Sequence, residues 1–296
     1  MCGIAGIFLK NPALEPRLGA MLSDMMEVLS DRGPDSAGFA IYGGIQPGFI
    51  KVTLRGPKGA ALTAAVEALL AGFAGASAVY HDTHAVISLA EGDLDALKQA
   101  IAARDDVQLV GIGERMELYK EVGLPRQVAD RFGLSGMSGT HAVGHTRMAT
   151  ESAVTTRGAH PFSTGNDQCL VHNGSLSNHN AVRRELRREG IAFETDNDSE
   201  VAAGYLTHKL RQGIGLRDAL QQSLADLDGF YTFVVGTEKG FAVLRDPIAC
   251  KPAVMAETDD YVAFGSEYRA LAVLPGIETA RVFEPEPATV YAWERA

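Results

Sequence analysis

The N-terminal residues could supply a nucleophile together with its own base. Cys2 follows Met1 and precedes Gly3 and Ile4. Removal of Met1 would leave Cys2 with a thiol and a free α-amine, and an α-amino group titrates near pH ~7.7, so it can take the thiol proton around neutrality. Methionine is usually trimmed when a small residue such as Cys follows it. The alternative is that Cys2 is a small apolar residue that opens a strand.

Three other positions carry groups that could bind an amino acid or stabilise an oxyanion. Arg147 follows a predicted strand, where a guanidinium can hold a carboxylate in a bidentate fork or form a surface ion pair. Asp198 precedes a predicted helix, where it either caps the helix or receives a substrate ammonium group. Asn173 and Gly174 close a strand; this dipeptide predicts a tight hairpin turn, and its amide and backbone N–H could donate to a developing oxyanion.

Two loop segments have a structural and a functional interpretation. Arg32 and Asp35 flank a Gly-Pro turn, and they could form a buried pair that organises the N-terminal strand and its nucleophile. The same residues are ordinary in a tight turn. His160 precedes Pro161, and a single histidine before proline is normally a structural loop residue.

These residues fall between strands and helices that occur in blocks along the chain. Segments rich in Val, Ile, Phe and Tyr predict strands at 3–9, 39–45, 140–145, 168–172, 230–237, 240–245 and 261–266. Helical periodicity predicts helices at 14–29, 178–189, 199–211 and 216–224. The order favours an α+β protein with antiparallel sheets flanked by helices.

The segment from about 57 to 138 differs from its surroundings. It contains predicted helices at 60–74 and 93–104 and predicted strands at 84–90 and 107–113, all short and bounded by glycine. We expect a small α/β unit inserted at about 57–138 into a single domain that spans 1–296.

The composition excludes several classes of function. With a net charge of -10 and a pI near 5.3, the chain is a poor candidate for binding nucleic acid or an anionic membrane. The sequence lacks a signal peptide and a long apolar stretch, which predicts a cytoplasmic protein. Its three cysteines fit neither a disulfide framework nor a metal site, and Cys169 and Cys250 are expected to be buried thiols.

Taken in order, the motifs resemble those of the class II, N-terminal-nucleophile glutamine amidotransferases. The matching motifs are Cys2-Gly3-Ile4, Arg32-Gly33-Pro34-Asp35, His145-Thr146-Arg147, Ala159-His160-Pro161, His172-Asn173-Gly174, Asp198-Ser199-Glu200, Arg245-Asp246-Pro247 with Lys251-Pro252, and Gly265-Ser266-Glu267 with Ala270-Leu271. Each motif is weak alone, but their joint order is highly specific.

The resemblance implies a fold, a reaction and a role for each matching residue. It implies a four-layer αββα sandwich and hydrolysis of the glutamine side-chain amide without a metal. By motif matching, Cys2 would be the nucleophile, and Asn173 and Gly174 would form the oxyanion hole. Arg147 would bind the substrate α-carboxylate and Asp198 its α-ammonium, while Thr150 and His160 would be part of the glutamine pocket. Arg32 and Asp35 would give structural support to the site.

Three positions depart from the pattern of relatives. Asp31 stands where relatives often have His, Met148 replaces a common aromatic residue, and Glu151 stands where some relatives have His. These differences leave the expected chemistry in place but bear on the subfamily and on how the pocket closes.

The resemblance also implies how the ammonia is used. The signature runs to residue 271 and leaves 25 residues, so we expect the ammonia acceptor to be a separate synthase subunit. The sequence looks most like the subunits associated with split glutamate synthases and N-methylglutamate synthase. We therefore expect no cofactor in this chain and a flavin on the partner. The alternatives are an independent N-terminal-nucleophile amidohydrolase and a non-catalytic regulatory subunit.

Overall fold

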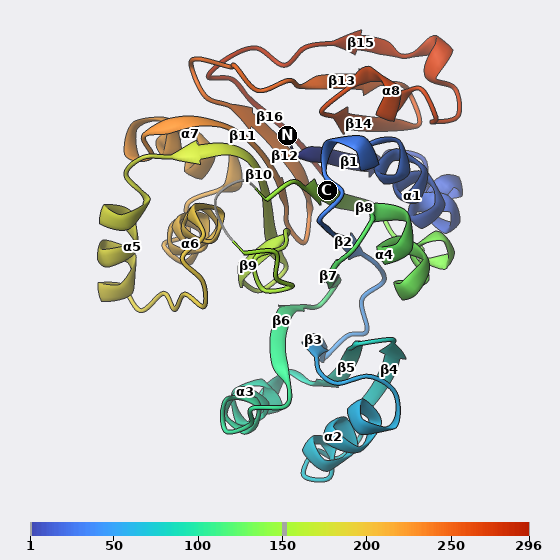
Figure 1. Cartoon of the computed structure of the whole chain (residues 1–296), viewed down its shortest axis with the longest axis vertical. Helices are drawn as coiled ribbons and strands as arrows, with labels where there is room; N and C mark the ends of the chain where they lie inside the picture. Colours follow the sequence, from blue (N-terminus) through green and yellow to red (C-terminus); the bar gives the residue numbers. More distant parts are fainter. Residues whose placement is uncertain (1, 150–152, 296) are drawn as a thin grey trace.

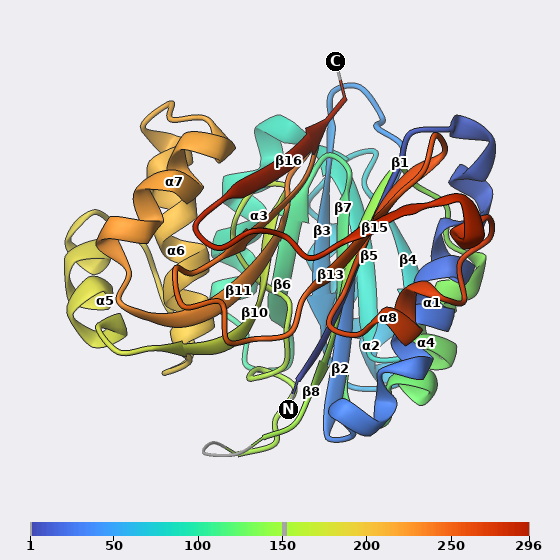
Figure 2. The same cartoon turned by 90° about the horizontal axis from the view of Figure 1, so that it is seen from above.

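The computed structural model describes residues 2–149 and 153–295, and its main body has four layers (Figure 1). A seven-stranded and a five-stranded sheet lie face to face, and helices cover the outer side of each (Figure 2). This arrangement confirms the predicted four-layer α+β sandwich.

The seven-stranded sheet places the N-terminal strand between two distant parts of the chain. Its order is β15 (Arg281–Phe283), β13 (Val254–Glu257), β14 (Tyr261–Gly265), β1 (Gly3–Leu9), β8 (His141–Arg147), β2 (Ser36–Tyr42) and β7 (Met116–Val122), and neighbouring strands are antiparallel. All of β1 is buried, in keeping with its entirely apolar and glycine sequence. Cys2, the residue before β1, therefore lies at the end of a central strand of a well-packed sheet.

The five-stranded sheet packs on the inner face of the first. Its order is β16 (Val290–Glu294), β12 (Gly240–Arg245), β11 (Gly229–Gly236), β10 (Gln168–Leu176) and β9 (Phe162–Gly165). Side chains such as Val171 and Phe241 meet Ile4, Phe8 and Phe264 of the first sheet in one buried cluster. The contact between these faces fixes the strand ends of the two sheets relative to each other.

Helices shield the outer faces. The bounds are α1 (Leu18–Val28), α4 (Pro125–Phe132) and α8 (Tyr268–Leu271) on the seven-stranded sheet, and α5 (His179–Arg188), α6 (Asp198–Arg211) and α7 (Leu216–Asp226) on the other. The first helix begins later than the predicted 14–29. Residues Pro12–Arg17 form a 3₁₀ turn instead, because Pro16 has no N–H to donate within a helix.

A smaller unit projects from the main body (Figure 1). Its sheet has the order β4 (Ser77–His81), β5 (His84–Ala90), β3 (Phe49–Arg55) and β6 (Gln108–Gly113), and it packs with α2 (Ala60–Leu70) and α3 (Leu94–Ala102) around its own apolar core. The segment predicted at about 57–138 overlaps this unit without coinciding with it, since β7 and α4 belong to the main body. A single domain with an insertion at those boundaries stays a prediction.

The hairpin turn predicted at Asn173 and Gly174 is wrong. Strand β10 continues through both residues to Leu176, and Gly174 pairs with Tyr231 of β11. Gly174 has a φ of +148°, and a Cβ atom there would lie 2.0 Å from the Phe230 carbonyl oxygen. Glycine is needed for this close approach of two strands.

Candidate active site

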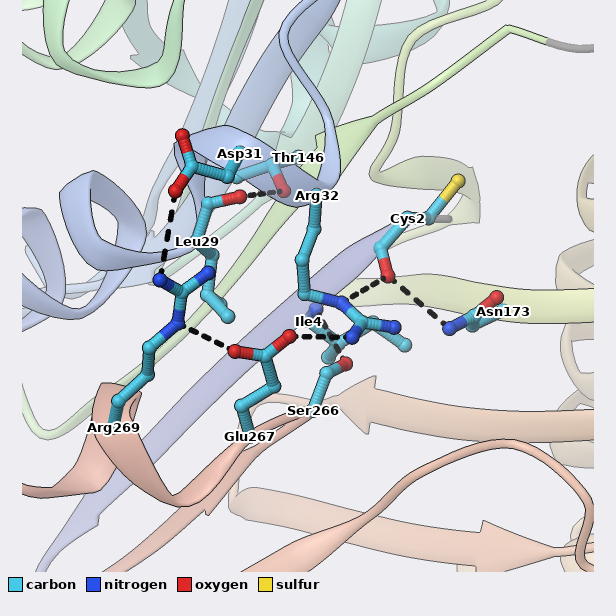
Figure 3. Close-up of polar contacts among 10 residues, drawn as sticks. All are labelled: Cys2, Ile4, Leu29, Asp31, Arg32, Thr146, Asn173, Ser266, Glu267 and Arg269. Atoms are coloured by element: carbon cyan, nitrogen blue, oxygen red, sulfur yellow. Dashed lines mark hydrogen bonds and ion pairs between the residues drawn. The ribbon is translucent and has the colours of Figure 1, made fainter.

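The start of β1 is where residues from both sheets converge. Antiparallel pairing aligns Gly3 with Thr146 at the end of β8 and Ala5 with Gly265 at the end of β14. The second sheet contributes Asn173 from β10 (Figure 3). Cys2 therefore lies beside segments that are more than a hundred residues away in sequence.

Two side chains hold the backbone of Cys2. Its carbonyl oxygen accepts hydrogen bonds from Arg32 Nε at 3.1 Å and from Asn173 Nδ2 at 3.2 Å. The thiol points away from both donors (Figure 3), and its Sγ lies 3.8 Å from the Met148 carbonyl oxygen. The backbone is thus fixed without either side chain engaging the sulfur.

Arg32 and Asp35 each support the site, but separately. No ion pair joins these two described residues: Arg32 contacts Glu267 at 2.5 Å, and the Asp35 carboxylate accepts a bond from the Ala149 N–H at 2.8 Å. The Asp35 N–H also donates to the Arg147 carbonyl at 3.1 Å. The predicted buried pair is therefore wrong, because each residue has a different partner.

Arg147 is the last residue of β8, at the same sheet edge as Cys2. Its side chain is buried, and Nη1 donates to the Ala153 carbonyl at 3.4 Å. The position is compatible with the predicted carboxylate clamp, which stays a prediction. Thr150 and Glu151 lie outside the described residues.

The side chain of Asn173 contacts the backbone of Cys2, and Gly174 follows Asn173 in β10. A primary amide has two N–H donors, so the bond from Asn173 to Cys2 is compatible with a second donation to an oxyanion. Gly174 is half-buried. Their oxyanion role stays a prediction.

Asp198 is tied to the end of β10. Its Oδ2 accepts a bond from the Leu176 N–H at 2.9 Å, and its Oδ1 lies 3.7 Å from His172 Nδ1. The cap of α6 is Asn197, whose side chain accepts from the Ser199 N–H. Capping therefore does not explain Asp198, and its predicted role toward a substrate ammonium stays a prediction.

His160 packs inside the protein against a second histidine. Its ring stacks on His145 with 4.1 Å between centroids, and the His160–Pro161 peptide is cis. Burial lowers the pKa of His145 to about 3 and that of His160 well below its ordinary value. Both rings are neutral at physiological pH. The predicted place of His160 in a glutamine pocket stays a prediction.

The three cysteines have different environments. Cys2 is half-buried and Cys169 is fully buried, as expected, and burial raises the pKa of Cys169 to about 11. Cys250 is exposed, so the expectation of a buried thiol is wrong there. It lies in the loop after β12 rather than in a strand.

Other features of the described chain lie away from this site. A cavity of about 280 Å³ lies between β6, β9 and α6, and its lining contains none of the predicted site residues. Among residues 2–149 and 153–295, no group of His, Cys, Asp and Glu is arranged to hold a metal ion. No described helix is both long and apolar enough to cross a membrane.

The sequence analysis gave no role to Glu267, which contacts Arg32. It is 235 residues from Arg32, the residue it contacts. The only sequence signal was its place in the Gly265-Ser266-Glu267 motif, and no local pattern predicts a partner that distant.

Known proteins resemble this chain in sequence and in fold. A family described as a glutamine amidotransferase domain matches residues 145–273. The glutamine amidotransferase-like protein GlxB of Rhizobium meliloti is 62% identical over 99% of this chain and 98% of its own length. A putative glutamine amidotransferase of Methanothermobacter thermautotrophicus is 36% identical over 99% of this chain and 100% of its own.

The fold has a counterpart among solved structures. The allosteric regulatory enzyme of purine biosynthesis superposes with a TM-score of 0.65 at 21% identity, over 99% of this chain and 47% of its own. This structure shares the fold, and the full-length sequence matches show that the chain belongs to the class II glutamine amidotransferase family.

Proposed function

We propose that this chain hydrolyses the side-chain amide of L-glutamine, with Cys2 as the nucleophile once Met1 is removed. The observation that carries the proposal is the placement of Cys2: Arg32 and Asn173 hold its carbonyl oxygen while its thiol points away from both. A nucleophile held by its backbone keeps a fixed geometry during attack. Membership of the amidotransferase family supports the same chemistry.

The mechanism uses the free amine as the base. The α-amine of Cys2 takes the thiol proton, and the sulfur attacks the amide carbon. Asn173 and Gly174 stabilise the oxyanion, and the C–N bond breaks as the amine returns the proton to the leaving ammonia. Water then hydrolyses the thioester to glutamate and regenerates the thiol.

Substrate recognition follows from two charges. Arg147 binds the α-carboxylate and Asp198 the α-ammonium of glutamine, with Thr150 and His160 lining the pocket. A simple acyl amide lacks both charged groups and cannot use these contacts.

Hydrolysis of glutamine by the processed protein tests this assignment. We expect glutamate release from glutamine at a rate far above that from simple acyl amides, and loss of activity in Cys2→Ser. A matched control is protein that retains Met1, since its Cys2 amine is an amide and cannot act as the base. Equal rates with glutamine and simple amides would instead indicate a general amidohydrolase, and no hydrolysis of any amide would indicate a regulatory protein.

We further propose that the ammonia passes to a separate synthase subunit of the glutamate synthase or N-methylglutamate synthase type, which carries a flavin. In support, the chain matches 98% of the amidotransferase-like relative but only 37% of the amidophosphoribosyltransferase of Methanocaldococcus jannaschii. Most of that longer enzyme thus has no counterpart in these 296 residues. We propose that both subunits work in the cytoplasm.

Reconstitution with a candidate synthase subunit tests the transfer. We expect the pair to aminate the acceptor with glutamine as nitrogen donor, and the synthase alone to require added ammonium. If the pair used glutamine no better than the synthase alone, the proposed transfer would be wrong while the glutaminase assignment could still hold.

A further inference from the structure

The carboxylate of Glu267 reaches Cys2 through a single intervening side chain (Figure 3). Its Oε1 accepts a bond from Arg32 Nη1 at 2.5 Å, and Arg32 Nε donates to the Cys2 carbonyl at 3.1 Å. Arg32 is thus held at one edge by Glu267 and presents another edge to Cys2. A guanidinium is planar and rigid, so fixing one edge orients the other.

Ser266, the residue before Glu267, binds the backbone of Ile4, two residues after Cys2. Ser266 Oγ accepts from the Ile4 N–H at 2.9 Å, and the Ser266 N–H donates to the Ile4 carbonyl at 3.0 Å. Residues Ser266 and Glu267 follow directly after β14, which pairs with β1. The two residues that follow β14 therefore contact both the start of β1 and the side chain of Arg32, which binds Cys2.

Glu267 also belongs to a balanced group of charges. Its Oε2 accepts from Arg269 Nε at 2.5 Å, and Arg269 Nη1 lies 3.5 Å from Asp31 Oδ2. Two carboxylates and two guanidinium groups thus alternate from Asp31 to Arg32.

Glu267 is ionised at neutral pH. Partial burial raises the pKa of Glu267, but the hydrogen bonds and charges of Arg32 and Arg269 outweigh this effect and leave the pKa below its ordinary value. The side chains of Arg32 and Glu267 are only 10% and 28% exposed, so solvent screens their contact less than a surface pair.

We propose that Glu267 is a positioning residue for the nucleophile: it orients Arg32 toward the Cys2 carbonyl and balances the charge of that guanidinium. The inference rests on the proposed role of Cys2 as the nucleophile. It assigns to Glu267 no contact with the substrate.

Glu267→Gln separates this role from a merely structural one. Glutamine keeps an oxygen that can accept from Arg32 but removes the charge, so the positive charge of Arg32 is no longer balanced. An unbalanced cation lowers the pKa of a nearby thiol or amine, so the pH profile should shift toward lower pH. A neutral acceptor also binds the guanidinium less strongly than a carboxylate does and leaves Arg32 less firmly oriented, which should reduce kcat by about 10- to 100-fold with little change in KM, because the proposed substrate-binding groups lie elsewhere.

The structure offers a matched control in Glu257. This glutamate also bridges two cations, with Lys10 Nζ at 2.7 Å and Arg281 Nη2 at 3.2 Å, and its side chain is 25% exposed. It lies in β13 of the same sheet, and in the part of the chain that the structure describes it contacts none of the predicted site residues. Glu257→Gln therefore removes the same charge from a similar environment, and we expect it to leave kcat and the pH profile unchanged.

The experiment measures two quantities in protein with Met1 removed: glutamine hydrolysis from pH 5 to 9, and the rate at which iodoacetamide alkylates Cys2 over the same range. Mass spectrometry of the peptides distinguishes Cys2 from the exposed Cys250, which serves as an internal reference. Thermal unfolding checks that each variant is folded. Glu267→Asp keeps the charge on a shorter side chain and should restore the pH profile even where kcat stays low.

The outcomes are distinct. A shifted alkylation profile for Cys2 alone, with reduced kcat in Glu267→Gln but not in Glu257→Gln, supports the positioning role. Wild-type kcat and an unshifted profile in folded Glu267→Gln would overturn it. If Glu267→Gln does not fold, Glu267→Asp decides, since a shifted profile in that charge-retaining variant counts against charge balance. If even the wild-type protein does not hydrolyse glutamine, the proposed function fails, while the alkylation profiles still test the positioning of Cys2.

Discussion

The side chains of Arg32 and Asn173 contact the carbonyl group of Cys2 and not its sulfur. Arg32 from the loop before β2 and Asn173 from β10 meet at this one oxygen. A nucleophilic residue benefits from a rigid backbone and from a reacting atom that no other side chain binds. The same contacts connect Glu267, through Arg32, to the backbone of Cys2.

Replacing Asn173 should impair turnover more than folding. Asn173→Ala removes the donor to the Cys2 carbonyl and the proposed oxyanion donor, so we expect kcat to fall about 10²- to 10³-fold. Steady-state kinetics with glutamine, together with thermal unfolding, measures both effects. A kcat within about twofold of wild type would show that the amide contributes to neither contact.

At the level of elements, the glycine at the end of β10 fixes how closely β11 approaches. Gly174→Ala combines an unfavourable φ of +148° with a Cβ 2.0 Å from the Phe230 carbonyl oxygen. We expect a loss of more than about 2 kcal/mol in unfolding free energy by urea denaturation. The matched control is Gly190→Ala, where φ is +80° and no atom lies within 4 Å of the added Cβ. Equal losses in the two variants would contradict the close-approach argument.

The loop before α6 is held by one buried carboxylate. Glu200 accepts bonds from the Glu194 N–H, the Thr195 N–H and the Thr195 hydroxyl at 2.7 to 2.8 Å. Glu200→Ala leaves these donors without their acceptor, so we expect a loss of about 2 kcal/mol in unfolding free energy. Because Asp198 begins the same helix, KM for glutamine should rise as well.

Kinetic and urea measurements on Glu200→Ala check both effects against Glu185→Ala, which changes an exposed glutamate on α5. If KM stays at the wild-type value in Glu200→Ala, the loop does not position Asp198.

Elements with an unambiguous local pattern could be predicted from the sequence. The apolar run at 3–9 became β1, and 240–245 became β12, with the predicted bounds. The short strands β13, β15 and β16 were missed, because pairing to neighbouring strands defines them more than their composition does. The turn at Asn173 failed for a related reason: the close approach of β11 determines the backbone there, and the local dipeptide preference does not.

The residues of the site could likewise be predicted only in part. Order along the chain was sufficient to nominate Cys2, Asn173 and Asp198; Asn173 in β10 contacts Cys2, and Asp198 contacts the end of β10. It did not predict which residues contact one another. Arg32 binds Glu267, 235 residues away, and the pairing of β1 with β14 helps to bring these two together.

At the scale of the whole molecule, buried neutral histidines link stability to pH. Burial lowers the pKa of His84, His141 and His145 to about 3 each, below the ordinary value of about 6.5. The unfolded chain then binds more protons than the folded one below pH ~6.5, so stability is full above that pH and falls as the pH drops toward 3.

Urea denaturation at pH 7 and pH 5 measures this dependence. Each of the three histidines should lower the free energy of unfolding at pH 5 by about 2 kcal/mol relative to pH 7. His141→Gln should reduce the difference between the two pH values, because it removes one of these groups. A difference equal to that of the wild-type protein would contradict the assignment of His141.

The central claim is that Cys2, with its amine free, attacks glutamine. The most direct test is to incubate the purified protein with a diazo-ketone analogue of glutamine and to sequence the N-terminal peptide by mass spectrometry. The account predicts a peptide that lacks Met1, carries one adduct on Cys2 and is protected by excess glutamine. An unmodified Cys2 in fully processed protein, or modification of only the exposed Cys250, would contradict it.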